Sequence, residues 1–302
     1  MIMKNAKNAN YIQRDHSASI LKSEGVELMR ISEALNKYGW LKKFLYGKPK
    51  EGYFIFVKKQ LKYPLITCVT INSKKIKQEM QNIVIIDKNL KISMQGTCSS
   101  LKKDLEGVHY ARGKIILKEG AHLKYNHLHS WNDGDEVNSN YEFYLEKNSR
   151  LDYNYNTVSS PKNLSLTTKV VCLKKSAANL KISGICKNSK MKIKENLILK
   201  ENNSSGILKL RFVGKENSEI LSHSSIAAEA ECKGHLDCQG LLVDKTSKIS
   251  LIPELACKDN RSQITHEASI GKISEEELHY LRTRGLNEQE AIDLIVNGFL
   301  EI

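Results

Sequence analysis

The chain of 302 residues has few of the patterns that mark the common classes of cysteine-rich, membrane or carbohydrate-binding proteins. Its seven cysteines include no Cys-x-x-Cys pair, which argues against a zinc ribbon or a thioredoxin-type site, and their odd number and wide spacing do not suggest a disulfide framework. No apolar run approaches the roughly 18 residues that a membrane-spanning helix needs. Only two tryptophans are present, and no carboxylate cluster recurs on successive repeats, which argues against a carbohydrate-active enzyme.

Arginine is scarce for a chain with a formal net charge of +13. Only 8 of the 47 basic residues are arginine, and the lysines are dispersed through turns instead of being gathered with aromatic residues. A nucleic-acid groove usually concentrates both, whereas dispersed lysines are typical of solvated turns and protected strand edges. We therefore expect neither nucleic acid nor membrane as a partner. No secretory signal is visible, so we expect the reducing cytoplasm as the location.

A degenerate repeat with a period of roughly 28 residues runs through the chain, as a polar turn followed by an apolar residue. From Leu123 the step is 28 residues to Leu151 and 29 to Leu180, and from Met191 two steps of 29 lead to Ile220 and Ile249. A fixed period with variable sequence is typical of a solenoid, in which each repeat buries its apolar face only by stacking on the next.

The segments between these turns have the length of strands, and no helical pattern separates them. Residues 114–117, 141–145 and 206–210 are examples. This pattern predicts a mainly β protein whose core is a parallel β-helix, with an antiparallel sandwich or barrel as the alternative.

Helical patterns are predicted at both ends of the chain. Residues 1–48 read as a helical segment because apolar residues from Val26 to Leu45 recur at near-helical spacing, and residues 49–271 form the expected β-helix core. In residues 272–302 two capping boxes, Ser274-x-x-Glu277 and Asn287-x-x-Glu290, predict two helices, with Gly298 as the stop of the second. The second helix is acidic, so a docking module for a protein is a better reading than a reader of DNA.

The candidate site lies near the C-terminus, where an isolated thiol precedes a His-Glu pair by one repeat. Cys238 stands 28 residues before His266, and Glu267 follows directly. Thiolates are the preferred ligands of iron–sulfur clusters, with imidazole and carboxylate as weaker and exchangeable ones. We expect Cys238 on a polar edge, where a neighbouring cation favours its thiolate, and we expect Cys238 and His266 on adjacent coils.

Other residues are weaker candidates for the same site. Additional ligands could come from Glu229, Glu231 and His235, and Cys232 or Cys257 would replace Cys238 if its assignment fails. Most of the six cysteines other than Cys238 are expected as small apolar fillers of strands, namely Cys68, Cys98, Cys172, Cys186, Cys232 and Cys257. His127 and His129 share one strand face and, with His122, are expected to be surface or core residues.

The C-terminal motifs resemble those of the SufB/SufD family, the β-helix subunits of the SUF iron–sulfur cluster assembly system. The matching segments are residues 265–273 (THEASIGKI), 276–285 (EELHYLRTRG) and 290–299 (EAIDLIVNGF). Weaker similarity covers residues 52–57, 82–87, 96–98 and 234–238, where GHLDC resembles the short archaeal-type members. The resemblance spans roughly residues 50–302.

The resemblance implies a non-catalytic scaffold that builds and transfers an iron–sulfur cluster, with a SufC-like ABC-type ATPase as partner. The chain agrees that it does not bind ATP itself, because it has no Gly-x-x-x-x-Gly-Lys-Ser/Thr loop. In the family one subunit supplies a cysteine and its paralogue a histidine; Cys238 and His266 match these positions in one chain. The resemblance therefore implies a homodimer through the C-terminal β-helix, with the C-terminal helices docking the ATPase.

Two departures from the family pattern bear on the ligand set. Thr265 stands where the larger bacterial subunit has an acidic residue, and the chain lacks that subunit's long N-terminal extension with its cysteines. A β-helix interaction module that binds no cluster is the alternative function. The two functions differ in whether the anaerobically reconstituted protein holds iron and sulfide.

Overall fold

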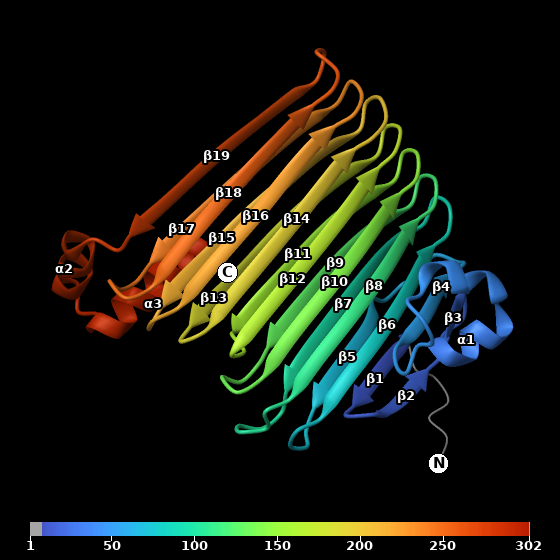
Figure 1. Ribbon diagram of the computed structural model, residues 1–302, viewed down its shortest axis with the longest axis horizontal. Coiled ribbons are helices and arrows are strands. Elements are labelled where there is room, and N and C mark those ends of the chain that lie inside the picture. The colour runs from blue at the N-terminus through green and yellow to red at the C-terminus, as the bar shows by residue number, and fades with distance from the viewer. Residues whose placement is uncertain (1–7, 302) are drawn as a thin grey trace.

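Strands alternate between two sheets along the chain, so that each coil contributes one strand to each sheet (Figure 1). The computed structural model describes residues 8–301. Sheet A has ten strands in the order β19-β17-β15-β13-β11-β9-β7-β5-β1-β2, and sheet B has nine in the order β18-β16-β14-β12-β10-β8-β6-β4-β3. All neighbours from β4 and β5 onward pair in parallel. The prediction of a mainly β protein with a parallel β-helix core is therefore confirmed.

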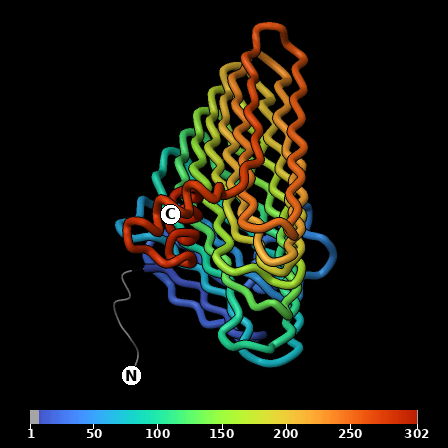
Figure 2. Tube along the Cα trace, turned by 90° about the vertical axis from the view of Figure 1, so that its left-hand side faces the viewer, coloured from blue at the N-terminus to red at the C-terminus, as the bar shows by residue number. Residues whose placement is uncertain are grey.

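The strands from β6 onward have 9 to 11 residues, and those before them have 5 to 7. Those of sheet A are β1 (Asn10–Arg14), β2 (Ser17–Leu21), β5 (Leu65–Ile71), β7 (Lys91–Ser100), β9 (His122–Ser130), β11 (Arg150–Ser159), β13 (Ala177–Lys187), β15 (Ser205–Lys215), β17 (Lys233–Leu242) and β19 (Gln263–Lys272). Those of sheet B are β3 (Val26–Arg30), β4 (Tyr53–Val57), β6 (Lys77–Ile86), β8 (Val108–Leu117), β10 (Glu136–Leu145), β12 (Asn163–Cys172), β14 (Lys190–Leu199), β16 (Glu219–Ala228) and β18 (Lys248–Cys257). Figure 2 shows the two sheets as facing walls.

Side chains alternate between the interior and solvent along each strand, as the two-residue period of a strand requires. In β10, for example, Val137, Ser139, Tyr141 and Phe143 point inward and are buried, while the residues that alternate with them face outward. Equivalent inward positions stack from coil to coil, and they form one continuous core from the N-terminal strands to Cys238. No coil buries its apolar residues alone, because their neighbours lie on the coils above and below.

The register confirms three of the four repeat steps. Leu123 lies opposite Leu151, Met191 opposite Ile220, and Ile220 opposite Ile249. The step from Leu151 to Leu180 is wrong: Leu151 lies opposite Ala178, so this coil is shorter than the coils on either side of it, and Leu180 pairs with Tyr153 instead. Ala178 and Leu180 are two residues apart on one strand and share a face, so the sequence alone does not show which of them lies opposite Leu151.

The helical prediction for residues 1–48 is wrong over most of the described part. Asn10–Arg14, Ser17–Leu21 and Val26–Arg30 are strands, and residues 1–7 lie outside the described residues. Val26 and Leu28 point into the core with a two-residue period because β3 pairs with β4, and this pairing overrides the helical spacing.

The helical part of the N-terminal segment is limited to α1 (Ile31–Lys37) and a 3-10 turn, η1 (Gly39–Phe44). These two elements cover the outer face of sheet B at its N-terminal end. They pack Ile31, Ala34 and Leu41 on the outward residues Ile83 and Ile85 of β6.

Two capped helices end the chain, as predicted, although Gly298 does not stop the second. They are α2 (Glu275–Thr283) and α3 (Glu288–Leu300), and both capping boxes are formed. α3 continues past Gly298 to Leu300, where Glu301 ends it in the left-handed conformation. Val296 and Leu300 of α3 pack on Val213 and Leu241, so α3 covers the outer face of sheet A. Within residues 8–301, no helix is both long enough and apolar enough to cross a membrane.

Candidate functional site

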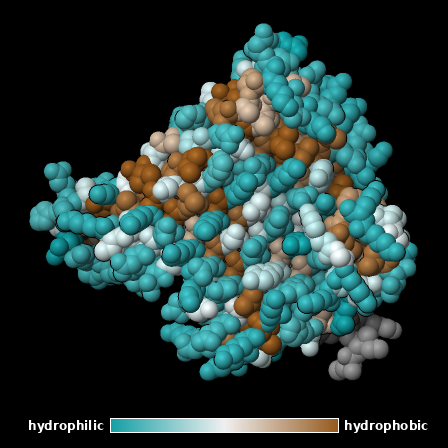
Figure 3. Space-filling view, in the orientation of Figure 1, coloured by the Kyte–Doolittle hydropathy of each residue, from teal (hydrophilic) through white to brown (hydrophobic). Residues whose placement is uncertain are grey.

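The predicted site lies in the last coils of the solenoid, at the end where the stack stops. β18 and β19 are the terminal strands of their sheets, and each has one edge without a partner strand among residues 8–301. The inward side chains of these strands are only partly covered: Ile249, Leu251 and Ile264 are half-buried, and Ile270 is 47% exposed. Hydrophobic surface is visible over this end of the molecule (Figure 3).

Cys238 is buried, which contradicts the expected polar edge. It points inward from the middle of β17, between Leu210 of β15 and Ala268 of β19, and is 1% exposed. Burial raises the pKa of its thiol to about 12, and the Asp237 carboxylate acts in the same direction while the Arg211 guanidinium opposes it. The thiol is therefore protonated at neutral pH in this closed arrangement, because the low-polarity interior disfavours a thiolate.

His266 lies on the coil next to Cys238, as predicted, but not directly opposite it. The coil that joins β17 to β19 is longer than the sequence spacing of the two residues, so His266 pairs with Leu236 and Cys238 pairs with Ala268. Paired residues of a parallel ladder point to the same side of the sheet. Cys238 and His266 therefore share the inner face as diagonal neighbours on adjacent strands. His266 is exposed because no further coil covers it within the described residues.

Glu267 lies on the opposite side of β19 from His266, because successive strand residues alternate. It pairs with Asp237 on the outer face of sheet A and is exposed. The chain by itself thus does not bring Glu267 to Cys238, and the predicted set of three ligands is not assembled within one chain.

The additional candidates lie away from the thiol. Glu229 and Glu231 are in the turn before β17, where Glu229 pairs with Lys258 at 3.0 Å and Glu231 with Arg261 at 3.4 Å. His235 faces outward, and its Nδ1 lies 2.8 Å from the Thr265 hydroxyl. These contacts are between neighbouring coils, so they stabilise the stack and do not converge on Cys238.

The two reserve cysteines differ in accessibility. Cys232 is buried, with Sγ 3.2 Å from the Ser204 hydroxyl, as expected of a strand filler. Cys257 is exposed at the end of β18 and is therefore not the filler that was expected. It lies on the inward side, opposite Ala228, and its Sγ donates to the Asp259 carbonyl at 3.1 Å.

A buried ion pair lies on the outer face of β15 and β17, directly behind the candidate thiol. Arg211 is 4% exposed and binds both carboxylate oxygens of Asp237, at 2.9 and 2.5 Å. The same guanidinium donates to the Leu210 carbonyl. Bidentate pairs of this kind have defined geometry, so the backbone that carries Cys238 is held firmly to β15.

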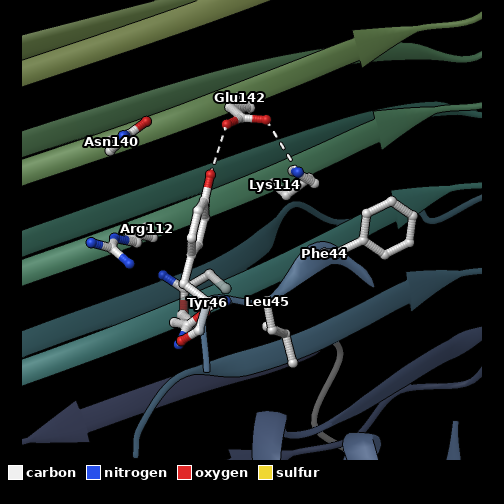
Figure 4. A pocket seen from close by; sticks show the side chains of 10 residues that line it. Phe44, Leu45, Tyr46, Arg112, Lys114, Asn140 and Glu142 are labelled. Carbon is white, nitrogen blue, oxygen red and sulfur yellow. Dashed lines mark hydrogen bonds and ion pairs between the residues drawn. The ribbon is translucent and has the colours of Figure 1, made fainter. Parts of the chain in front are cut away.

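A shallow pocket on the outer face of sheet B is unrelated to these residues. Figure 4 shows it between η1, β8 and β10, with Tyr46 and Lys114 both directed at Glu142. The distances to Glu142 are 3.3 Å from the Tyr46 hydroxyl and 3.1 Å from Lys114 Nζ, and Arg112 lies over the Tyr46 ring. The polar groups satisfy one another, and the pocket is built from coils far from β17 and β19.

Taken together, the fold is that of a β-solenoid protein with an open C-terminal end, where a thiol and an imidazole share the interior face. Family comparison agrees with the residue pattern: residues 69–299 match the family described as "SUF system FeS cluster assembly, SufBD core domain". The chain belongs to the SufBD family, and this membership supports a role in iron–sulfur cluster assembly.

Archaeal relatives are similar over nearly the whole chain. An "Iron-sulfur cluster assembly SufBD family protein" of Methanothermobacter thermautotrophicus is 30% identical over 97% of this chain and 78% of its own length. A protein of the same description from Archaeoglobus fulgidus is 30% identical over 99% of this chain and 86% of its own. A relative from Staphylococcus epidermidis is 24% identical over 83% of this chain and 55% of its own length.

The difference in burial predicts an order of alkylation. With iodoacetamide at pH 8, Cys257 should be modified first and Cys238 more slowly by on the order of 100-fold, because a buried thiol with a raised pKa offers almost no thiolate. Mass spectrometry of tryptic peptides measures both rates. Cys172, also buried and with its pKa raised to about 12, is the matched control and should stay unmodified until the chain is denatured. Equal rates at Cys238 and Cys257 would contradict the closed arrangement.

Proposed function

We propose that the protein is a scaffold on which an iron–sulfur cluster is assembled and from which it is transferred, with Cys238 as the principal ligand and His266 as a second ligand. The observation that carries this proposal is the shared inner face of Cys238 and His266 at the open end of a SufBD-type solenoid. A scaffold must release its cargo, and a mixed cysteine and histidine site is more exchangeable than an all-thiolate one.

The burial of Cys238 supports a site that is closed at rest. Iron and sulfide reach the thiol only when β19 moves away from β17, because Ala268 and its neighbours on β19 cover it. Opening hydrates the thiol and so lowers its pKa from the raised value. His266 moves with β19, so the entering water takes the thiol proton as the thiolate binds iron, and closure of β19 returns His266 beside Cys238 as the second ligand.

A test replaces the thiol and leaves the stack intact. Cys238→Ala should lose most of the iron and sulfide that the parent retains after anaerobic reconstitution with the partner ATPase, because alanine offers no ligand. The measurement is iron and acid-labile sulfide per chain, with circular dichroism as the check on folding. Cys172→Ala, a buried cysteine in the middle of the solenoid, is the matched control and should retain the cluster.

If Cys238→Ala retains as much iron and sulfide as the parent, Cys238 is not the principal ligand, and Cys232 or Cys257 becomes the next candidate. A parent protein that binds neither iron nor sulfide under these conditions would instead favour the alternative, an interaction module without a cluster.

The open end also supports a homodimer. Within residues 8–301, β18 and β19 each have one unpaired edge, and Ile252 and Ile270 are 48% and 47% exposed beside these edges. Long, exposed, apolar strand edges are rare in isolated chains because they pair with other chains. Pairing across a twofold axis would continue both sheets, and would place each Cys238 and His266 beside those of the second copy.

A single charge placed at this end should prevent the pairing. We expect Ile270→Asp to shift the protein from dimer to monomer in multi-angle light scattering, because the carboxylate would be buried without a partner in the interface. Ile207→Asp is the matched control, since Ile207 is 48% exposed on the outer face of β15, away from the edge. A parent that is monomeric alone and in complex would contradict the proposal.

A SufC-like ABC-type ATPase is the proposed partner of the C-terminal helices. The apolar stripe of α3 is already used, because Val296 and Leu300 pack on the protein's own sheet. The available surface is therefore α2 and the outer side of α3, where Tyr280 is 57% and Leu294 is 54% exposed. Deleting residues 274–302 would uncover Val213 and Leu241, so point substitutions test docking more cleanly.

The double variant Tyr280→Ala, Leu294→Ala should lower co-purification of the ATPase by roughly tenfold or more, in line with the loss of exposed anchors from an interface. Circular dichroism should be unchanged. The control is Tyr144→Ala, Leu221→Ala, which removes two exposed side chains from the outer face of sheet B. If the helical variant co-purifies with the ATPase as well as the control does, the docking surface lies elsewhere.

A further inference from the structure

The interior of the solenoid contains a second cluster of metal-ligating side chains, several coils from Cys238. Cys98 on β7 and His127 and His129 on β9 point into the core, and all three are buried. One ligand atom from each lies within 4.8 Å of the others. The distances are 3.6 Å from Cys98 Sγ to His127 Nε2 and 3.0 Å between the two Nε2 atoms.

We propose that Cys98, His127 and His129 form a binding site for a thiophilic divalent metal ion, with Zn²⁺ as the best-fitting ion. This site is separate from the proposed function and does not depend on it.

The separations between the ligand atoms match those of a tetrahedral zinc centre. With Zn–N bonds of about 2.0–2.1 Å and a Zn–S bond of about 2.3 Å, two nitrogens lie roughly 3.3 Å apart and nitrogen and sulfur roughly 3.6 Å apart. The observed 3.0 and 3.6 Å are close to these values. One thiolate and two imidazoles are also a donor set that suits zinc. The three residues leave the fourth position of the metal for a further ligand.

Buried aromatic residues orient both histidines. The Tyr153 hydroxyl lies 3.3 Å from Nδ1 of His127, and the Tyr155 hydroxyl lies 3.1 Å from Nδ1 of His129. Trp131 donates its indole N–H to the same Nδ1 of His129 at 3.1 Å. A metal-binding histidine typically donates the N–H of its second ring nitrogen to such a partner. The two tyrosine hydroxyls can accept it, whereas the Trp131 indole is a donor and favours the other tautomer of His129 in the ion-free core.

These bonds define where protons go on binding. The indole N–H makes Nδ1 of His129 an acceptor, so its proton lies on Nε2, between the two histidines. A metal ion that binds there displaces this proton to Nδ1 of His129. The new N–H then donates a hydrogen bond to the Tyr155 hydroxyl, and the Trp131 indole N–H loses its acceptor. Cys98 releases its thiol proton to the solvent as it binds the ion. His127 already has the required tautomer if it donates from Nδ1 to Tyr153.

The surroundings also provide a counter-charge. A divalent ion with one thiolate leaves a net charge of +1 in the core, and burying such a charge alone is costly. Glu195 on β14 is fully enclosed, and neither carboxylate oxygen has a well-formed hydrogen bond within the described chain. Its charge would act on Tyr153 and Tyr155, the residues that contact the two histidines. Burial raises the pKa of Glu195 well above its ordinary value, so its side chain is neutral without the ion, and loss of its proton when the ion binds would leave a carboxylate that balances the charge.

Co²⁺ provides the test, because a cobalt–thiolate bond gives a charge-transfer absorption in the near ultraviolet and tetrahedral Co²⁺ gives strong visible bands. The full-length protein is titrated anaerobically in its folded state and, because the site is enclosed, is also refolded from denaturant with Co²⁺ present. We expect one Co²⁺ per chain with the thiolate band, displaced by Zn²⁺, and a higher melting temperature of the zinc-loaded protein.

Variants locate the ion. Cys98→Ser should abolish the charge-transfer band, and His129→Gln should weaken binding by roughly tenfold or more. Glu195→Gln should also weaken it. The matched control Cys172→Ser replaces a buried cysteine outside the cluster and should bind Co²⁺ as the parent does. Each variant's circular dichroism shows whether it folds.

Two results would overturn the proposal. One is the absence of a thiolate band by both loading routes in the folded parent. The other is a band that survives in Cys98→Ser and disappears in Cys238→Ala, which would place the metal at the C-terminal end. Because Cys238→Ala should keep the band while losing the iron–sulfur cluster, failure of either proposal can be told from failure of the other.

Discussion

Every coil of this protein depends on the next for its apolar contacts, and this dependence shapes both ends of the molecule. In the middle, Phe143 and Leu166 have no measurable exposure because coils lie on both sides of them. At the N-terminal end the chain folds back, and β3 pairs antiparallel with β4 so that Val26 and Leu28 close the core. At the C-terminal end the described chain provides no such cover, and Ile270 stays exposed. Cys238 and His266, the candidate ligands of the iron–sulfur cluster, lie at this uncovered end.

The same stacking allows polar chemistry inside the core. Inward positions stack from coil to coil along the solenoid, and a polar side chain at one of them is enclosed by the coils above and below it. Tyr153, Tyr155 and the two buried histidines satisfy one another through hydrogen bonds, which offsets the cost of burying them. Burial lowers the pKa of His127 to about 3 and that of His129 well below its usual range, so both rings are neutral. Neutral imidazoles are the form that binds metals.

The fold could be predicted from the repeat, because coils of similar length place equivalent apolar residues at a regular spacing in the sequence. Turn chemistry and strand length identified the β-helix, and the capping boxes at Ser274 and Asn287 identified the two C-terminal helices. The N-terminal strands were misread because a short apolar segment such as Val26–Arg30 fits both periods until its partner strand is known. The short coil from Leu151 to Ala178 was misaligned for a related reason, since coil length depends on the turn and not on the strands.

The candidate sites were predictable only in part. The pairing of Cys238 with the strand of His266 followed from the period, but its burial did not, because exposure of an inward residue depends on whether a further coil covers it. The Cys98 cluster was missed, although a signal existed: Cys98 precedes His127 by one repeat. If the one-repeat spacing is applied to every cysteine and histidine, it predicts that Cys98 and His127 lie on adjacent coils.

The anchoring of the C-terminal helices suggests how a partner could open a closed thiol. α3 is fixed to the outer face of sheet A by Val296 and Leu300, and Glu301 forms ion pairs with Lys181 and Lys209 on β13 and β15. α2 is different: it is exposed or half-buried along its length, and only residues 273 and 274 separate it from β19. A force applied to α2 therefore reaches β19 directly, while α3 and the Arg211–Asp237 pair hold the neighbouring strands in place. Separation would then fall between β17 and β19, the outer of the two ladders that flank Cys238.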